Sequence, residues 1–189
     1  ANMAIAYHPS FEYVAIEERG DIYIVADDLL KATADKCGWL EPEVLARFAG
    51  ERLEGAVFRH PFVDRDSPGI LADHVTLEQG TGAVHTATGH GQEDYRSGQE
   101  YGLTTYCPVN GEGRFYHADT APGRLPEEWI GKTVWEANPV VIGILHERGA
   151  LLAEGTVEHS YPHCWRCHNP TIFRATDQWF IGMDRNDLR

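Results

Sequence analysis

The sixteen residues 80–95, GTGAVHTATGHGQEDY, decide how the rest of the chain is interpreted. The glycines at 80 and 82 predict a tight turn, and those at 89 and 91 allow backbone conformations that other residues avoid. From Gln92 onward the spacing becomes helical, and Gly102 stands where a helix-ending glycine is expected. A short strand, a glycine loop and a helix start predict a site that presents backbone N–H groups to a small ligand.

One carboxylate of this stretch has a special position. Asp94 falls in the first turn of the predicted helix, where the helix dipole favours a negative charge. The residue pattern is compatible with two interpretations: a surface carboxylate that stabilises the helix start, or a fixed charge that holds the ammonium group of a ligand. The neighbouring Glu93 is expected to be solvated.

The histidines and threonines of the loop are further candidates. His85 ends the predicted strand, where a histidine is more often structural, although imidazole chemistry also suits acid–base catalysis. His90, inside the loop, is expected to be structural. Thr86 and the backbone of residues 86–89 are candidate N–H donors to a carbonyl or an oxyanion.

Length and composition bound the class of protein. The chain has 189 residues, 42% of them hydrophobic, which predicts one globular domain or one domain with a small appendage. Neither an apolar run long enough to cross a membrane nor a secretory signal is present in the sequence. Because the sequence begins at Ala1 rather than methionine, we expect it to be excised from a longer protein.

The formal net charge of −13 argues against a broad surface that grips nucleic acid through its phosphates. A simpler interpretation is that an acidic domain is soluble and that the charge requires no partner.

Two of the four cysteines show a motif, Cys164-Trp-Arg-Cys167. We expect reduced thiols in a cytoplasmic protein, since no secretory signal is seen. The motif has three interpretations: half of a zinc site that needs two more ligands, a c-type haem attachment motif completed by His168, or a thiol pair without metal.

The hydrophobic patterning predicts an α+β fold with a mixed, barrel-like β-sheet core and flanking short helices. Strands are expected over residues 4–7, 11–17, 21–26, 55–62, 69–76, 151–159 and 171–175. Helices are expected over residues 26–37, from residue 41, over 92–101 and over 139–148, with a hairpin around residues 110–111.

Residues 80–95 closely resemble the signature of the editing domain, the first connective insertion or CP1, of bacterial isoleucyl-tRNA synthetases. Residues 160–167, SYPHCWRC, and residues 174–180, RATDQWF, resemble a second motif of the same domain. Valyl enzymes usually carry lysine in place of His85, and leucyl enzymes a different apolar or thioether residue. The resemblance covers nearly the whole chain.

The resemblance implies the editing-domain fold of the class I valyl, leucyl and isoleucyl enzymes, with an editing domain over residues 1–158 and a return segment toward the synthetase body over residues 159–189. It implies hydrolysis of valine esterified to the 3′ end of isoleucine tRNA, with valyl-adenylate as a second substrate. The implied partners are that 3′ end, valine as the rejected amino acid and the remainder of the synthetase, without a membrane and without a cofactor for editing.

The resemblance also assigns residues. Asp94 and His85 are the candidate catalytic residues, since the matching aspartate anchors the amino acid's α-amino group and the matching histidine lines the pocket beside it. The implied substrate-binding residues are Asn2, His85, Thr86, Ala87, Thr88, Gly89 and Asp94. Cys164 and Cys167 are implied to be a structural zinc half-site whose partners lie outside the chain.

The sequence departs from the family pattern at two places. Thr88 stands where the family usually has proline, and threonine does not fix φ as proline does, so a looser loop is expected. The threonine-rich strand that precedes Asn2 in the family is absent from this sequence, which puts the activity of the isolated chain in doubt. The alternative function is a non-catalytic module that binds an amino acid or a nucleoside, and a third is a small c-type haem protein.

Overall fold

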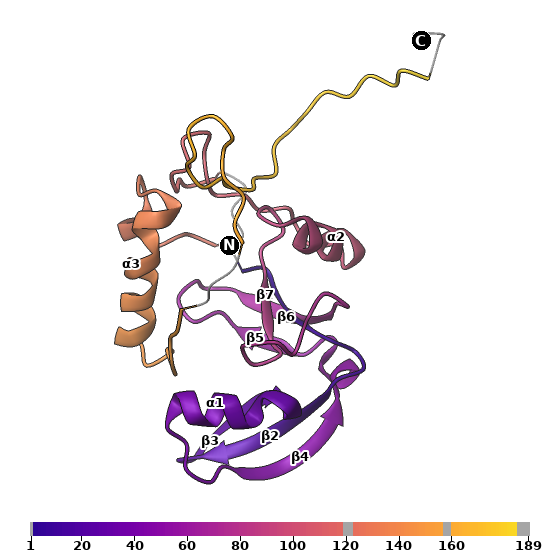
Figure 1. Ribbon diagram of the computed structural model, residues 1–189, viewed down its shortest axis with the longest axis vertical. Coiled ribbons are helices and arrows are strands. Elements are labelled where there is room, and N and C mark those ends of the chain that lie inside the picture. The colour runs from indigo at the N-terminus through magenta and orange to yellow at the C-terminus, as the bar shows by residue number, and fades with distance from the viewer. Residues whose placement is uncertain (1, 119–122, 157–159, 185–189) are drawn as a thin grey trace.

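The computed structural model describes residues 2–118, 123–156 and 160–184 (Figure 1). It confirms a mixed α+β architecture of two sheets and three short helices. Within the described residues the sheets do not close into a barrel, which corrects the barrel-like core expected from the sequence. No helix in the described part of the chain is long and apolar enough to cross a membrane.

A four-stranded sheet carries the glycine loop. Its central strand β1 pairs in parallel with β6 and antiparallel with β7, and β5 forms the edge beside β6. The strands are β1 (Ala4–Tyr7), β5 (Val57–Arg59), β6 (Asp66–Leu71) and β7 (Val84–Thr86). Because β1 and β7 are antiparallel neighbours, the start of the described chain lies beside the start of the glycine loop.

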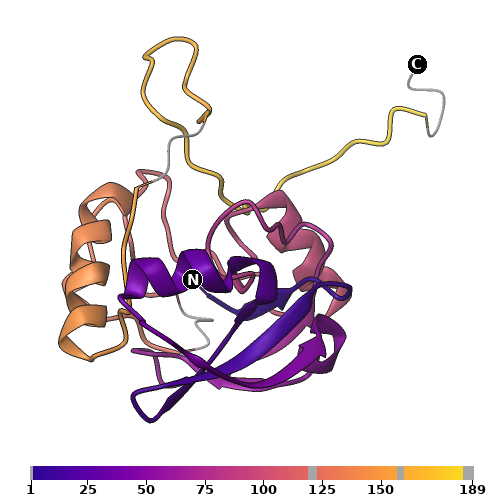
Figure 2. The ribbon, with the colours of Figure 1, turned by 60° about the horizontal axis from the view of Figure 1, so that its bottom comes forward.

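A three-stranded antiparallel sheet has the order β3-β2-β4, and α1 lies across it (Figure 2). Its elements are β2 (Glu12–Glu18), β3 (Asp21–Ala26), β4 (Glu43–Ala49) and α1 (Leu30–Cys37). Arg19 and Gly20 both have positive φ, as a two-residue hairpin turn between twisted strands requires. The helix expected from residue 41 is wrong, because residues 43–49 instead pair with β2 along its length.

The other helices are α2 (Gln92–Glu100), α3 (Val134–Glu147) and the 3-10 turns η1 (Asp27–Leu29), η2 (Gly50–Leu53) and η3 (Glu127–Trp129). α2 lies where the sequence predicts it and is followed by Gly102 at φ +63°. α3 begins earlier than expected, since Thr133 and Glu136 form a capping box that sets its start upstream of Pro139.

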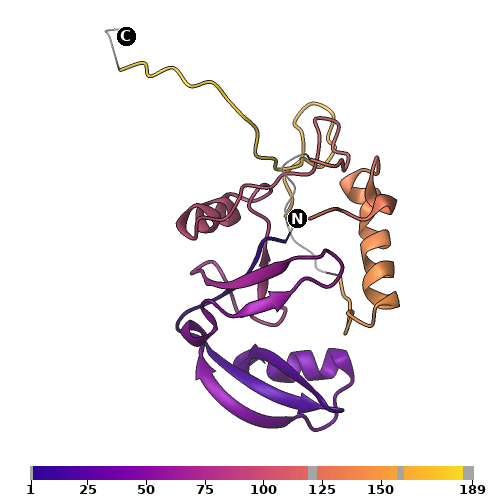
Figure 3. The same ribbon diagram turned by 180° about the vertical axis from the view of Figure 1, so that it is seen from behind.

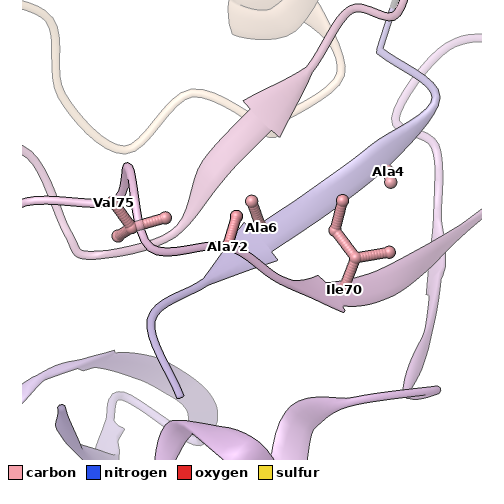
Figure 4. Close-up of a cluster of buried hydrophobic side chains, with 5 residues drawn as sticks. All are labelled: Ala4, Ala6, Ile70, Ala72 and Val75. Atoms are coloured by element: carbon pink, nitrogen blue, oxygen red, sulfur yellow. The ribbon is translucent and has the colours of Figure 1, made fainter. Parts of the chain in front are cut away.

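Three apolar clusters fill the molecule. The first lies in the four-stranded sheet and consists of Ala4, Ala6, Ile70, Ala72 and Val75 (Figure 4). The second joins the two sheets through Tyr7, Tyr13, Ala26, Leu29 and Leu53. The third packs β2 and β3 against α1 and contains Val14, Ile16, Val25, Ala34 and Trp39.

Beyond α3 the described chain forms no further helix or extended strand, so the strands expected over 151–159 and 171–175 are wrong in their described parts. An isolated bridge between His163 and Pro170 closes this segment on itself, together with the hydrogen bond from the Thr171 N–H to the Pro162 carbonyl at 3.0 Å. After Ala175 the chain extends away from the body, and the side chains of Trp179 and Phe180 are exposed (Figure 3). The expected boundary between residues 158 and 159 lies outside the described residues.

Candidate functional site

Strand β7 places His85 and Thr86 at the end of the four-stranded sheet. His85 pairs with Ile5 and Thr86 with Ala4, and the Met3 N–H donates to the Thr86 carbonyl at 2.7 Å. Successive side chains of a strand point to opposite faces, so Thr86 is fully buried while His85 reaches the surface. The Thr86 hydroxyl is buried without a hydrogen-bond partner among the described residues.

The turn before β7 is fixed to the three-stranded sheet, as the sequence predicts for a tight turn. Gly82 has φ +75°, and a Cβ there would lie 2.6 Å from that of Ala26, so only glycine fits. The Gly82 carbonyl accepts from the Tyr13 hydroxyl at 2.7 Å, and the Thr81 carbonyl accepts from the Ala26 N–H at 2.8 Å. The entry to the glycine loop is therefore held by buried contacts.

Asp94 lies in the first turn of α2, as predicted, and its carboxylate turns back onto the loop. Its Oδ2 accepts the Ala87 N–H at 3.1 Å. Within the described residues no hydrogen bond to Oδ1 is found. A Cβ on Gly91 would come within 3.0 Å of Oδ2, so glycine leaves room for this arrangement. The carboxylate is thus half-buried and oriented, with one oxygen left for another donor.

Some backbone N–H groups of the loop already donate a hydrogen bond within the protein, and others do not. The Ala87 N–H is taken by Asp94, and the His90 N–H donates to the Ala87 carbonyl at 2.8 Å. The N–H groups of Thr88 and Gly89 donate to no other described residue. Of the four backbone donors that the sequence singles out, these two remain for an oxygen of a ligand.

Thr88 fastens the loop and does not loosen it, contrary to the expectation from the missing proline. Its side chain is buried, its hydroxyl donates to the Thr104 carbonyl at 2.8 Å, and the same oxygen accepts the Tyr106 N–H at 3.2 Å. Its methyl group packs on Gly98, where a Cβ would lie 2.6 Å away. Two hydrogen bonds and this close packing hold the loop where proline would restrict φ.

A cavity of about 440 Å³ opens beside the loop, and His85, Ala87 and His90 form one of its sides. The His85 ring is reachable from the cavity, yet the surrounding protein lowers its pKa by desolvation, which the charge of Asp94 opposes. His85 is therefore neutral near pH 7 and can border an uncharged group. The His90 Nδ1 lies 3.1 Å from the Phe173 carbonyl, in keeping with the predicted structural role.

Asn2 lies at the same end of the sheet. It precedes Met3, whose N–H bonds to Thr86, and its carbonyl accepts from the Arg65 guanidinium. Its side-chain oxygen is buried and has no partner among the described residues. The structure thus places Asn2 next to the end of β7, from which the glycine loop begins.

Cys164 and Cys167 lie on one tight turn away from this loop. The Cys167 and Arg166 N–H groups point at the Cys164 sulfur and lower the pKa of its thiol. Among the described residues no group of three metal-ligating side chains is found. Two thiols on one turn fit half of a tetrahedral zinc site, which needs two ligands from elsewhere.

Sequence reasoning missed the segment that covers the loop. The Ala175 N–H donates to the Gly89 carbonyl at 2.8 Å, and the Arg174 Nε donates to the Val109 carbonyl at 2.7 Å. These partners are far apart in the sequence, and no local pattern reveals the contact. The only signal was the second motif, RATDQWF, which begins at Arg174.

The chain matches known proteins over its full length. It is 56% identical over 188 residues to an isoleucine–tRNA ligase of Nitratidesulfovibrio vulgaris, covering 100% of this chain and 19% of that protein. It is 52% identical over 194 residues to the ligase of Methylococcus capsulatus and 48% identical over 189 residues to that of Fervidobacterium nodosum, covering 20% of each. Among solved structures, GlLeuRS-CP1 is similar with a TM-score of 0.43 and 19% identity, over 54% of this chain and 43% of that one. No family model matches.

These relatives are aminoacyl-tRNA synthetases. The chain is similar to isoleucine–tRNA ligases over its full length and spans about a fifth of the length of the relatives it matches.

Proposed function

We propose that this chain is the post-transfer editing domain of an isoleucine–tRNA ligase and hydrolyses valine esters of isoleucine tRNA. The observation that carries the proposal is the half-buried Asp94 carboxylate, which is oriented by the Ala87 N–H beside a cavity bordered by His85. Valine and isoleucine esters both carry an α-ammonium group, so an oriented carboxylate suits this substrate class.

The physical need for a second pocket follows from the size of the substrates. One methylene in an apolar pocket is worth about 1–3 kcal/mol, a range for which isoleucyl-tRNA synthetase is itself a reference example. A synthetic site therefore accepts valine at an appreciable rate, and a smaller pocket elsewhere must remove it. Ala87 and His85 line the cavity beside the end of β7 and supply the proposed boundary of the amino-acid side chain.

In the proposed reaction, Asp94 binds the ammonium group and so fixes the ester carbonyl relative to the loop. Water adds to the carbonyl carbon, and the N–H groups of Thr88 and Gly89 stabilise the oxyanion. The ester C–O bond then breaks, one proton of the water passes to the ribose oxygen and the other to solvent, and valine leaves as a carboxylate. His85, neutral near pH 7, borders the side chain, and the step requires no cofactor from this chain.

The remaining parts of the proposal concern partners. The acidic surface suits a domain that receives only the 3′ end of a tRNA, while the rest of the synthetase holds the nucleic acid in the cytoplasm. We propose that Cys164 and Cys167 contribute half of a structural zinc site completed by ligands outside this chain. The exposed residues 176–184 then lead toward the synthetase body.

Deacylation assays test the proposal. The chain is incubated with isoleucine tRNA charged with radioactive valine or isoleucine, and release of the amino acid is compared with the reaction without protein. We expect faster release of valine than of isoleucine. Tight binding of the valyl ester without accelerated release would instead identify a non-catalytic binding module, and equal release of both amino acids would contradict editing.

A further inference from the structure

A second cavity, of about 600 Å³, lies beside α2 and apart from the glycine loop. Among the described residues, it has no lining residue in common with the cavity beside His85. Its lining on α2 includes Glu93, Ser97 and Glu100, which follow the three- and four-residue spacing of one helix face. The helix α2 therefore contributes Asp94 to the glycine loop and a different set of polar side chains to this cavity.

Hydrogen bonds join the elements that surround this cavity. The Tyr101 hydroxyl donates to the Glu54 carboxylate at 2.7 Å and accepts the Leu71 N–H at 3.0 Å, which connects the end of α2 to η2 and β6. The turn after β6 is held on the central strand, because the Ala72 N–H donates to the Tyr7 carbonyl at 2.9 Å. Ala72 also belongs to the first apolar cluster (Figure 4). The fold therefore holds these walls of the cavity in place.

The lining of the cavity is predominantly acidic. Among the described residues, four carboxylates and one guanidinium line it, namely those of Glu54, Asp73, Glu93, Glu100 and Arg96. Burial raises the pKa of the Tyr101 hydroxyl, and the carboxylates of Glu54 and Glu100 raise it further. A cavity lined by one sign of charge focuses its field and concentrates ions of the opposite sign. The charge of this lining therefore favours a cationic ligand.

Two buried polar groups of the same lining have no partner. Ser97 lines the cavity although only 7% of it is exposed, and its hydroxyl forms no hydrogen bond with another described residue. The Nε2 atom of His74 is also buried without a partner among the described residues. Buried polar groups are nearly always hydrogen-bonded, so an unpaired hydroxyl in a cavity indicates a position for a ligand. A hydroxyl oxygen accepts a hydrogen bond from an ammonium group.

The distribution of the carboxylates selects the kind of cation. No group of three His, Cys, Asp or Glu side chains among the described residues is arranged to hold a metal ion. The carboxylates of the cavity come instead from the end of η2, the turn after β6 and both ends of α2. Pro9, Leu71 and Ala72 add apolar surface to the same lining. Separate carboxylates and apolar surface in one cavity match separate ammonium groups joined by methylenes.

We propose that this cavity binds an aliphatic polyamine, with ammonium groups at the carboxylates of Asp73 and Glu100 and at the hydroxyl of Ser97. Its methylenes lie on the apolar part of the lining. Arg96 opposes the binding of a cation only in part, because four carboxylates accompany one guanidinium. The volume of about 600 Å³ is within the usual range of small-molecule sites. The proposal is independent of the editing reaction, since the two cavities are lined by different residues.

Calorimetric titration of the full chain with spermidine, at constant ionic strength, tests this site. Ser97→Ala removes the buried hydroxyl without changing the net charge, and it should weaken spermidine binding about 2- to 10-fold, as loss of one hydrogen bond does. Ser160→Ala, at an exposed serine outside the cavity, is the matched control and should bind as wild type does. Wild-type affinity in Ser97→Ala, or no binding of spermidine to the wild-type chain, would overturn the proposal.

A pair of double variants separates a site from diffuse attraction to an acidic protein. Asp73→Asn with Glu100→Gln removes two carboxylates of the cavity and should weaken spermidine binding about 3- to 20-fold. Glu41→Gln with Glu128→Gln removes two exposed carboxylates elsewhere and should change the affinity less than about 2-fold. Both pairs change the net charge equally, so equal losses of affinity would contradict a site at this cavity.

Magnesium ions and spectra of the wild-type chain complete the test. Magnesium chloride at the same ionic strength should leave the spermidine affinity unchanged, and displacement of spermidine would identify a metal ion as the ligand instead. In ¹⁵N spectra, the amide resonances of residues 72–74 and 96–101 should shift on addition of spermidine. Thermal unfolding checks that each variant is folded. If Ser97→Ala is unfolded, unshifted resonances of these residues in the wild-type titration would by themselves overturn the proposal.

Discussion

The two sheets differ in their buried polar side chains. We compare the three-stranded sheet and α1 with the four-stranded sheet and its glycine loop. Residues 12–49 contain no histidine, and they contain no buried side-chain polar atom without a hydrogen-bond partner. Such atoms occur on Asn2, Ser67, Thr86 and Tyr106, all outside that region. Regular pairing and an apolar core suffice for the first region, whereas the rest of the described chain retains buried polar atoms without such partners.

This difference in buried polar atoms indicates that one region of the fold mainly provides stability and that the other carries the candidate site. Buried unpaired polar groups cost free energy and persist in native proteins where another role requires them. Here several of these atoms, on Asn2, Ser67 and Thr86, lie in or next to the four-stranded sheet, and the second apolar cluster connects that sheet to the more regular one. Substitutions matched between the two regions test this division.

The largest effect is expected at Asp94. Asp94→Asn keeps the size of the side chain and removes the charge, so binding of a non-hydrolysable valyl-adenosine analogue should fall about 100- to 1,000-fold, as when one partner of a desolvated charge pair is lost. Glu93→Gln, one residue earlier and exposed, is the matched control and should change affinity little. Calorimetry measures both, and equal losses in the two variants would contradict a specific role for Asp94.

The next largest effect is a pH dependence of the free energy of unfolding, which we expect to arise from His60 beside the four-stranded sheet. His60 is buried, and its Nδ1 accepts the N–H groups of Phe62 and Val63. Desolvation and the charge of Arg65 lower its pKa to about 4. Because the folded-state pKa lies below the ordinary value of about 6.5, the stability that neutral His60 provides is present above pH 6.5 and is lost as the pH falls toward 4.

The expected loss from His60 is up to about 3 kcal/mol between pH 7.5 and 4. His60→Asn supplies a non-titrating acceptor and should flatten this part of the pH dependence. His146→Asn, at an exposed site in α3, should leave it unchanged. Urea unfolding at several pH values measures the free energies, and parallel curves for wild type and His60→Asn would show that His60 is not responsible.

A smaller effect is expected from the buried threonines. Thr88→Val removes the hydroxyl that bonds to Thr104 and Tyr106, leaving two backbone groups unpaired at a cost of about 1–3 kcal/mol. Thr33→Val, in α1, loses one long bond of 3.4 Å to Gly80 and should cost less. Thermal unfolding compares them, and a larger cost at Thr33 would be incompatible with Thr88 as the anchor of the loop.

The smallest effect is expected in the three-stranded sheet. Ile16→Val removes one buried methylene from the third cluster and should lower the free energy of unfolding by about 0.5–1.5 kcal/mol. The affinity for the valyl-adenosine analogue should stay at the wild-type value, because the cluster lies outside the site. A loss of affinity without a comparable loss of stability would show that the two regions are coupled in binding.

The sequence predicted those parts of the fold that depend on local pattern. Hydrophobic alternation, helix caps and glycine positions predicted six features. These are the strands β1, β2 and β3, the helix α1, the turn at Gly82 and the helix start at Asp94. Strand β4 was missed, because Pro42 imitates a helix start and only pairing with β2 makes the segment a strand. The α3 start was missed because Thr133 and Glu136 decide it, upstream of the proline.

The candidate site was only partly accessible to sequence reasoning. Asp94 and His85 belong to one continuous motif, so their proximity could be predicted. The contact of Ala175 with Gly89 and the placement of Trp135 beside His85 depend on tertiary packing across long sequence separations. The role of Thr88 was misjudged for the same reason, since its hydrogen-bond partners lie sixteen and eighteen residues away.

The most direct test of the central claim is the ratio of two affinities. Non-hydrolysable valyl- and isoleucyl-adenosine analogues differ by one methylene, and calorimetry with the wild-type chain gives both dissociation constants. A pocket that fits valine should bind the isoleucyl analogue about 10- to 100-fold more weakly, because an extra methylene in a filled site costs about 1–3 kcal/mol. Equal affinities, or tighter binding of the isoleucyl analogue, would contradict an editing pocket at Asp94 and His85.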